Sequence, residues 1–313
     1  MRNIIVQLIR SSKQNHYKDY FKKNAKNIRN TWKGIRSIIN INSKSNKCGP
    51  TSLLIKNNLV TEPAKVADNF NQYFATIANK LQEKIHNSGQ NFKSYLDKSN
   101  DHSIFIYPTH AGEVSNLISS IDENKASGPH SIPLNIMKYI NPIISVPLTS
   151  IINLSFKTGI YIESLKISKV IPVFKDKGSK LDYNNYRPIS LLSNVNKIIE
   201  NLMHKRISDF LSKYECLYNL QFGFRKGHST THTLIFLTET IRKALDNNSF
   251  ACGIFIDLQK AFDTVDHTLL LYKLDHYGIR GEANKWLKSY LKNRKQFTCI
   301  NGFNSIEVNI VQG

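Results

Sequence analysis

The 313-residue sequence has only four cysteines, and none of them lies close to another. They therefore provide neither the short paired spacing of a zinc site nor the framework of a disulfide-rich secreted domain. No apolar run approaches the ~18 residues of a membrane span, since the nearest stretch, residues 140–156, contains Pro142 and Pro147. These absences argue against secreted scaffolds and membrane-spanning proteins, and they predict an intracellular location without a membrane partner.

Acidic residues are scarce relative to basic ones. The chain has 43 Lys and Arg against 23 Asp and Glu, a formal net charge of +20. Residues 1–60 contain 13 of the basic residues and a single acid, Asp19. A surplus of this size favours a polyanionic partner through long-range attraction and counterion release. A basic protein that does not bind nucleic acid is the alternative, because net charge constrains function only loosely.

Hydrophobic residues make up 41% of the sequence, which allows a sizeable packed core and argues against global disorder. Apolar residues at three- and four-residue steps predict helices over residues 1–42 and 63–84, with a linker starting near residue 40. From residue 109 the pattern predicts an α+β fold. The expected helices cover residues 109–122 (with Thr109 as a candidate N-cap), 133–159 (two helices separated near Asn141–Pro142), the second half of 185–211, 228–248 and 282–294; the expected strands lie near residues 169–174, 186–191 and 250–258, with a hairpin over 296–313 that turns at Asn301–Gly302.

The stretch "GIFIDLQKAFDTVDH", residues 253–267, takes a run of strand-forming residues directly into Asp257. Mg²⁺-dependent phosphoryl transfer needs hard oxygen ligands that are held rigidly beside the reacting oxygens. A carboxylate at the end of a central strand meets that requirement. A helix N-cap or an ordinary strand-end Asp is the alternative for Asp257, because a short motif of this kind also occurs by chance.

Five segments in a fixed order carry a resemblance to a known family. In chain order they are "KVIPVFKDKGSKLDYNNYRPISLLSNVNKIIENLM", "QFGFRKGHSTTHTL", "GIFIDLQKAFD", "YGIRGEANKWLKSYLKNRKQ" and "NIVQG". Together they resemble the reverse transcriptases, or RNA-directed DNA polymerases, of non-LTR retrotransposons of the jockey and LINE type. The resemblance implies the fingers and a partial palm of a right-hand polymerase. The expected parts are a basic helical extension and linker (residues 1–60), a helical pre-polymerase segment (61–109), fingers (110–245) and a partial palm (246–313).

The resemblance assigns the catalytic carboxylate and its surroundings. Asp257 would be a ligand of two Mg²⁺ ions, with Mn²⁺ as the alternative metal, and the backbone carbonyl of Leu258 would add a contact. Phe262 would lie beneath the incoming sugar and select deoxynucleotides; a core aromatic at the start of a helix is the alternative for Phe262. Asp263 and Asp266 are interpreted as structural or capping residues.

The resemblance also assigns groups that bind the nucleotide and the template. Arg187 would bind the β- and γ-phosphates, and Lys175 would supply a lysine there, with Lys177 and Lys180 as alternatives or all three as solvated turn residues. Gln312 belongs to a segment that resembles the family's Val-Pro-Gln-Gly motif. The residues assigned to the template strand are Arg225, Lys226 and His228, which lie beside Phe222 and Phe224 in a pattern that suits phosphate contact and base stacking.

A two-metal site needs more than one carboxylate. In the family the others come from a Tyr-x-Asp-Asp hairpin downstream, and the 313 residues contain no Asp-Asp pair. We therefore expect a truncated piece of a reading frame that is inactive by itself, with a non-catalytic nucleic-acid-binding remnant as the alternative. The implied partners are an RNA template, a DNA primer or target and dNTPs, in a nuclear or cytoplasmic ribonucleoprotein; the oligomeric state stays open.

Overall fold

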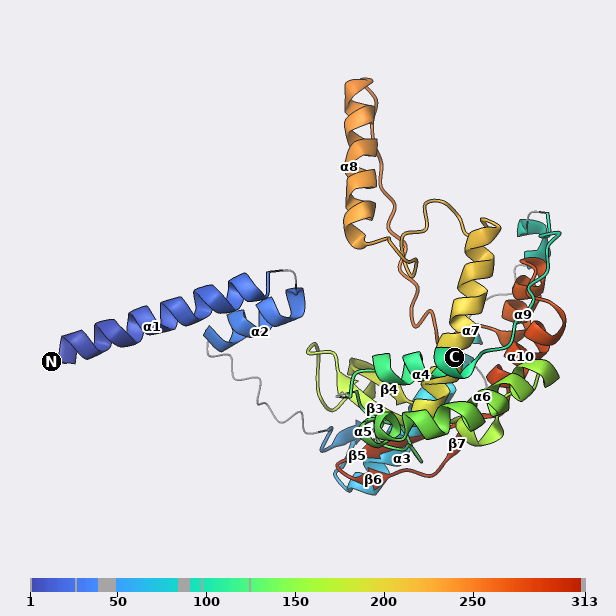
Figure 1. Cartoon of the computed structure of the whole chain (residues 1–313), viewed down its shortest axis with the longest axis horizontal. Coiled ribbons are helices and arrows are strands. Elements are labelled where there is room, and N and C mark those ends of the chain that lie inside the picture. The colour runs from blue at the N-terminus through green and yellow to red at the C-terminus, as the bar shows by residue number, and fades with distance from the viewer. Residues whose placement is uncertain are drawn as a thin grey trace. The chain divides into compact units, whose positions relative to one another are not determined.

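The computed structural model divides the chain into two units, Met1–Gly49 and Pro50–Gly313, which are described separately (Figure 1). The residues that the structure describes are 2–25, 27–38, 49–83, 91–96, 98–123 and 125–310.

The first unit is a helical hairpin made of α1 (Arg2–Lys23) and α2 (Ile28–Ile38). The single helix expected over residues 1–42 is therefore wrong, and residues 39–42 lie outside the described part. Asparagine side chains explain the break, because they compete with the helix backbone for hydrogen bonds. The Asn24 amide donates to the Tyr20 carbonyl over 2.8 Å, and Asn27 Oδ1 accepts from the Asn30 amide over 3.1 Å.

Within the described part of the second unit, five strands form a mixed sheet with the order β4-β3-β5-β6, and β7 also pairs with β5. Strand β3 pairs antiparallel with β4 and parallel with β5, whereas β6 and β7 run antiparallel to β5. A short β1–β2 hairpin, which the sequence pattern does not predict, precedes them. The bounds are β1 (Leu53–Ile55), β2 (Asn58–Val60), β3 (Ile167–Phe174), β4 (Tyr186–Leu191), β5 (Arg294–Ile300), β6 (Phe303–Asn304) and β7 (Val308–Ile310).

The predicted turn at Asn301–Gly302 is confirmed between β5 and β6. Asn301 and Gly302 have φ values of +50° and +88°, which a two-residue hairpin turn of this hand requires at both positions. Asparagine and glycine adopt positive φ at low cost, so the local sequence determines this hairpin.

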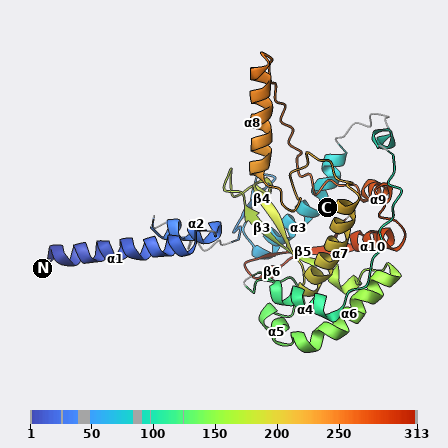
Figure 2. The same ribbon diagram turned by 45° about the horizontal axis from the view of Figure 1, so that its top comes forward.

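Helices surround the sheet and supply most of the core (Figure 2). Trp286, only 1% exposed, packs edge to face on Phe156 and Tyr161 in the main cluster. Most of the helices from residue 63 onward follow the predicted periodicity, whereas the pattern does not predict α9. The bounds are α3 (Pro63–Gln82), α4 (Ala111–Ser120), α5 (Leu134–Tyr139), α6 (Asn141–Thr158), α7 (Asn194–Lys213), α8 (Thr230–Asp246), α9 (His267–His276) and α10 (Gly281–Leu291), with 3₁₀ turns η1 (Phe92–Tyr95), η2 (Glu163–Leu165) and η3 (Tyr183–Asn185).

Thr109 does not cap helix α4. The N-cap is His110, whose Nδ1 accepts from the Glu113 amide over 3.2 Å. The Thr109 hydroxyl instead donates to Glu113 Oε2 over 2.7 Å. Glu113 also pairs with Arg206 of α7, 3.0 Å away. The Thr109 hydroxyl, which the sequence suggests as the cap, therefore donates to the carboxylate of this ion pair.

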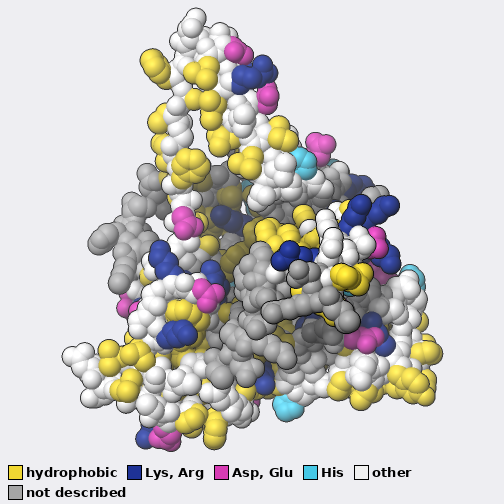
Figure 3. Space-filling view, turned by 90° about the vertical axis from the view of Figure 1, so that its left-hand side faces the viewer, with side chains coloured by type: hydrophobic (Ala, Val, Ile, Leu, Met, Phe, Trp, Pro, Cys, Tyr) yellow, Lys and Arg dark blue, Asp and Glu magenta, His cyan; other side chains and the backbone are white. Residues whose placement is uncertain are grey.

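The strand expected over residues 250–258 does not form. This stretch has no regular structure and all its side chains are exposed. It runs back alongside α8, which stands away from the sheet in both ribbon views (Figures 1 and 2). A helix satisfies its own backbone hydrogen bonds, so α8 offers this stretch no strand partner. Hydrophobic side chains are accordingly visible along the projecting top of the molecule (Figure 3).

The fold is thus a mixed arrangement of helices and one main sheet, as the α+β expectation requires in its coarse form. No helix among the described residues combines the length and the apolar character needed to cross a bilayer.

The Glu113–Arg206 pair generates a stability prediction. The Arg206 side chain is fully buried and that of Glu113 is 13% exposed. Burial by itself would raise the pKa of Glu113, but hydrogen bonds from Thr109 and Arg206 and the Arg206 charge lower it to about 2. Because this folded-state pKa lies below the ordinary value of 4.5, the pair stabilises the protein above that pH and loses its effect as the pH falls toward 2.

We expect Glu113→Gln to lower the free energy of unfolding at pH 7 by on the order of 3 kcal/mol, because it leaves Arg206 buried without its partner. Urea unfolding should also show a flatter pH dependence between pH 5 and pH 2. The control is Glu123→Gln, which removes a partly exposed ion pair with Lys138 and should cost less than about 1 kcal/mol. Equal effects of the two substitutions would contradict this account.

Candidate active site

Asp257 lies on the exposed segment that connects α8 to the turn before α9. Its side chain makes no hydrogen bond or ion pair with any described residue, so its carboxylate is free to accept a ligand. It is neither a helix cap nor a residue held by a paired strand. Leu258, whose carbonyl is the predicted second contact, is likewise exposed. The chain therefore presents the carboxylate but does not fix it through a β-strand, which corrects the expectation from the sequence.

Phe262 follows Asp257 on a tight turn. Its ring is 72% exposed, so the alternative of a core aromatic does not describe its position. The ring meets Phe224 edge to face, with centroids 5.8 Å apart and an interplanar angle of 88°. This contact brings the segment after Asp257 next to the segment that contains Arg225 and Lys226.

The two neighbouring acids, Asp263 and Asp266, differ in their surroundings. Asp266 is the N-cap of α9, and its Oδ1 accepts from the amides of Thr268 and Leu269 over 2.7 and 3.0 Å. The expected capping role of Asp266 is therefore confirmed. Asp263 is half-buried, and burial raises the pKa of its carboxyl although the Lys260 charge opposes that change.

Lys175 and Arg187 occur together at one end of the β3–β4 pair. Arg187 is directly opposite Val173 in the antiparallel register, and Lys175 follows the last residue of β3. The Lys175 ammonium donates to the Asn184 carbonyl over 2.7 Å. The Arg187 side chain is exposed and has no partner among the described residues. The pairing of β3 with β4 thus places both basic residues at the same end of the strand pair, and their positive charges suit an anionic ligand.

The candidate template residues lie just before α8. Arg225 Nη1 donates to the Tyr218 carbonyl over 3.0 Å, and His228 Nδ1 lies 3.2 Å from the Lys226 carbonyl. The Lys226 side chain is exposed. Gln312 lies outside the described residues, so the structure places eight of the nine predicted site residues, at positions 175, 187, 225, 226, 228, 257, 258 and 262.

Sequence reasoning misses a cluster built on Tyr73 of α3. The Lys260 ammonium donates to the Tyr73 hydroxyl over 3.0 Å and lies 4.5 Å from the centre of its ring. The Tyr73 hydroxyl in turn donates to Asn184 Oδ1, and its ring packs on Tyr183 with centroids 4.1 Å apart. The periodicity of α3 assigns Tyr73 only to the apolar face of the helix. The signal in the sequence that could have pointed to this cluster is Lys260, a lysine between Asp257 and Phe262.

Electrostatics in this cluster follow from burial and from nearby charges. Burial, with Asp182, Tyr183 and Asp263 close by, raises the pKa of Tyr73 to about 12. Burial also lowers the pKa of the Lys260 ammonium; Asp263 opposes that change and the Lys175 charge reinforces it. Lys260 donates to Tyr73, Tyr73 donates to Asn184, and Lys175 donates to the carbonyl of the same Asn184, so the turn after Asp257 lies close to the basic end of the β3–β4 pair.

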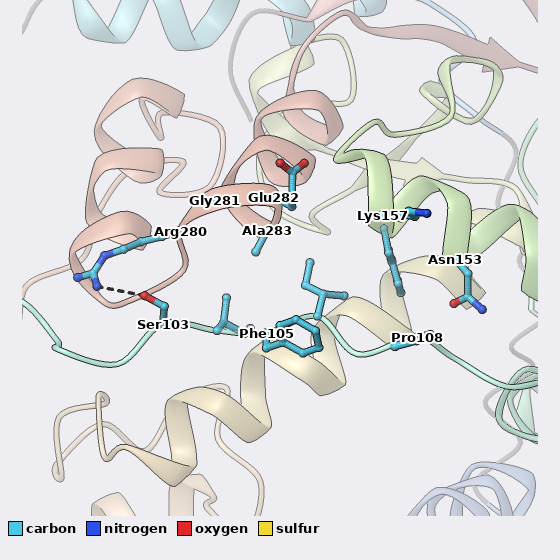
Figure 4. A pocket seen from close by; sticks show the side chains of 12 residues that line it. Ser103, Phe105, Pro108, Asn153, Lys157, Arg280, Gly281, Glu282 and Ala283 are labelled. Carbon is cyan, nitrogen blue, oxygen red and sulfur yellow. Dashed lines mark hydrogen bonds between the residues drawn. The ribbon is translucent and has the colours of Figure 1, made fainter.

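The described residues contain no group of three His, Cys, Asp or Glu side chains that would hold a metal by themselves. Asp257 fits a divalent cation as one hard oxygen ligand, and the remaining ligands of a complete site would have to come from elsewhere. A cavity of about 670 Å³ lies between the extended segment 103–108, α6 and α10, with Phe105 and Arg280 among its lining residues (Figure 4). None of the predicted site residues lines it.

Comparisons with known proteins show what this region is similar to. Residues 175–312 match the family model described as "Reverse transcriptase (RNA-dependent DNA polymerase)". The chain is 30% identical over 210 residues to the "Probable RNA-directed DNA polymerase from transposon BS" of Drosophila melanogaster, over 65% of this chain and 22% of that protein. It is 28% identical to the RNA-directed DNA polymerase from mobile element jockey of the same species, over 68% of this chain and 23% of that protein. A probable RNA-directed DNA polymerase from transposon X-element, also from Drosophila melanogaster, is 28% identical over 66% of this chain and 23% of its own length.

The contrast between Asp257 and Asp266 gives a prediction. We expect Asp266→Ala to lower the free energy of unfolding by about 1 kcal/mol, because it removes two hydrogen bonds at the start of α9, whereas Asp266→Asn should retain most of the stability. Asp257→Ala should change stability by less than about 0.5 kcal/mol, because its side chain contacts nothing in the described structure. Denaturant unfolding of the three variants tests this, and a larger loss for Asp257→Ala than for Asp266→Ala would refute it.

Proposed function

We propose that this chain belongs to the reverse transcriptase family and forms the part of an RNA-directed DNA polymerase of a non-LTR retrotransposon that binds the nucleotide and the template, because residues 175–312 match that family model. The chain spans only 22% and 23% of the length of the BS and jockey relatives, so the activity in their names is a proposal for the whole protein that would contain it. In this assignment residues 110–245 are the fingers and residues 246–313 a partial palm.

The single observation that supports this proposal best is the family match itself. It covers residues 175–312, and every predicted site residue lies within it. One placement and one contact in the structure agree with a shared site. Lys175 and Arg187 lie at one end of the β3–β4 pair, and Phe262 of the Asp257 segment contacts Phe224 of the candidate template segment.

The residues take distinct roles in this proposal. Arg187 and Lys175 bind the triphosphate of the incoming nucleotide through charge-assisted hydrogen bonds. Phe262 packs against the sugar and disfavours a 2′-hydroxyl, while Gln312 contacts the same nucleotide. Arg225, Lys226 and His228 contact the template backbone, and the exposed ring of Phe224 offers a surface on which a base can stack.

Asp257, with the Leu258 carbonyl, would hold Mg²⁺ or Mn²⁺ beside the α-phosphate. Such ions lower the pKa of the attacking primer 3′-hydroxyl and stabilise charge on the leaving pyrophosphate when they are bound. Asp257 contributes the anchoring oxygen and leaves the remaining coordination to other ligands. The 313 residues hold no Asp-Asp pair to complete such a site, so we infer that this chain by itself does not polymerise.

The basic segment of residues 1–60 would bind nucleic acid as well, since it carries 13 Lys and Arg and one acid. Location in a nuclear or cytoplasmic ribonucleoprotein follows from the same assignment. A nucleic-acid-binding remnant without nucleotide binding is the second candidate, and the excess of positive charge favours it as much as the first.

Nucleotide binding separates these two candidates. We expect a fluorescent dATP analogue to bind the chain in the presence of Mg²⁺ and Arg187→Ala to weaken binding roughly tenfold, the cost of one charge-assisted hydrogen bond of about 1.5 kcal/mol. The matched control is Arg242→Ala on α8, which removes the same charge from an exposed arginine that pairs with Glu239. Fluorescence anisotropy measures both. Equal affinities for the two variants would remove Arg187 from the nucleotide site.

Template binding and polymerisation are tested together. The chain should bind an RNA template annealed to a DNA primer with an affinity that falls steeply with salt. The Arg225→Ala/Lys226→Ala double variant should reduce the slope of log K against log salt by about 0.7 to 0.9 for each phosphate that the variant no longer neutralises. No primer extension is expected with Mg²⁺ and dNTPs.

Lys65→Ala/Lys98→Ala, which removes two exposed lysines paired with Glu62 and Asp101, serves as the control for the change in charge. Binding that does not respond to salt would exclude the template role. Extension that disappears in Asp257→Ala would show that the chain is active by itself, against our inference.

A further inference from the structure

The cluster around Tyr73 joins three segments that are far apart in the sequence. Tyr73 belongs to α3, Asn184 to the loop between β3 and β4, and Lys260 to the turn after Asp257. The Lys260 ammonium donates to the Tyr73 hydroxyl over 3.0 Å, and that hydroxyl donates to Asn184 Oδ1. Because Lys175 donates to the backbone carbonyl of the same Asn184, over 2.7 Å, the connection reaches the proposed phosphate-binding lysine.

Burial shows where the Asp257 segment is attached. Every residue from position 229 to position 259 is exposed except Ala244, which is half-buried. Lys260 is the first residue after this stretch with a partly buried side chain, and residues 263–267 are also partly buried. Three peptide units separate Asp257 from Lys260, a reach of at most about 10 Å. Asp257 is therefore attached to the rest of the second unit through the turn at Lys260, and the contacts of that turn determine its location.

The conformation of the turn agrees with this role. Lys260 has φ +50°, a backbone region that side chains other than glycine and asparagine rarely adopt. The Lys260 carbonyl accepts from the Thr264 amide and from its hydroxyl, each over 3.2 Å. A left-handed lysine persists only where its surroundings hold it, and here the aromatic ring and hydroxyl of Tyr73 hold the ammonium.

We propose that Lys260 and Tyr73 are positioning residues that fix Asp257 relative to Lys175 and Arg187. The inference rests on the proposed function, since it concerns how a metal-binding carboxylate is held near a triphosphate-binding pair. The charged groups near Lys260 are Asp263 on its own turn and Lys175 on the β3–β4 loop, with Asp182 close to Tyr73. The Tyr73 ring and hydroxyl fix the orientation of the Lys260 ammonium, and the half-buried Asp263 adds charge attraction. A simple ion pair would supply the attraction without fixing the orientation.

The first test measures the segment itself. Tyr73→Phe keeps the ring on Tyr183 and removes only the hydroxyl, and Lys260→Met keeps an unbranched side chain without the ammonium. We expect either change to raise the hydrogen exchange of the Thr264 and Val265 amides, which donate to the Lys260 and Phe262 carbonyls, about fivefold, and the double variant to add little to the single ones, because the two groups act on each other. Lys93→Met is the matched control, since Lys93 also lies over a tyrosine ring, 4.6 Å from the centre of Tyr272.

The second test measures a property that a merely structural role would not change. Nucleotide affinity is measured with Mg²⁺ and with EDTA, and the ratio reports the contribution of Asp257. Lys260→Met and Tyr73→Phe should reduce this ratio toward that of Asp257→Ala; the ratio is the readout and not the affinity in EDTA, because Asn184 contacts both Tyr73 and Lys175. Lys260→Arg keeps a cation over the ring and should restore part of the ratio.

The outcomes separate the two proposals. If Asp257→Ala removes the Mg²⁺ effect but Lys260→Met and Tyr73→Phe leave it intact, the positioning role is overturned and the proposed function stands. If the unchanged chain shows no Mg²⁺ effect, the proposed role of Asp257 fails, and positioning of a metal ligand fails with it. Hydrogen exchange equal to that of Lys93→Met would overturn the positioning role independently of nucleotide binding.

Discussion

The parallel pairing of β3 with β5 is the constraint on which the arrangement of the second unit depends. It places Ile167 opposite Lys295 and Val170 opposite Thr298, so two strands that are separated by a long stretch of the chain lie side by side in the sheet. Parallel strands require such a crossover, and this one contains β4, α7, α8, α9 and α10. The other edge of β3 pairs with β4, so the connection from β3 to β5 begins and ends on the same sheet. The basic end of the β3–β4 pair is therefore held in place beside α3.

The carboxylate segment is attached to that fixed point by side chains and not by strand pairing. Its apolar residues are exposed, and α8 beside it offers no free backbone groups. The segment is held by the Lys260 ammonium, which contacts the ring and hydroxyl of Tyr73, and by the hydrogen bond from the Tyr73 hydroxyl to Asn184. Hydrogen bonds of this kind give direction at a modest net stability, so the segment is located without being deeply buried. The proposed site, which would admit a nucleotide and a template strand, needs that combination of access and placement.

Each agreement or difference between the sequence pattern and the structure has a physical cause. Periodicity found α3 and α6, and the Asn301–Gly302 turn followed from residues that adopt positive φ. Local signals failed where a distant partner intervened. Thr109 does not act as a cap because Glu113 pairs with Arg206, 93 residues away along the chain. The stretch 250–258 has strong β propensity, but propensity describes how a side chain suits a sheet and does not supply a neighbouring strand.

The sequence by itself determined most of the helices from residue 63 onward, the turn chemistry, the basic excess and the match of residues 175–312 to the reverse transcriptase model, because each depends on nearby residues or on residue types in order. It also named Asp257, Arg187 and Phe262, and their roles stay predictions. Only the tertiary structure decided that Phe262 meets Phe224, and that Tyr73 and Asn184 hold the turn after Asp257. Contacts between α3, the β3–β4 loop and residue 260 arise from the crossover geometry of the sheet, and no pattern confined to neighbouring positions contains that information.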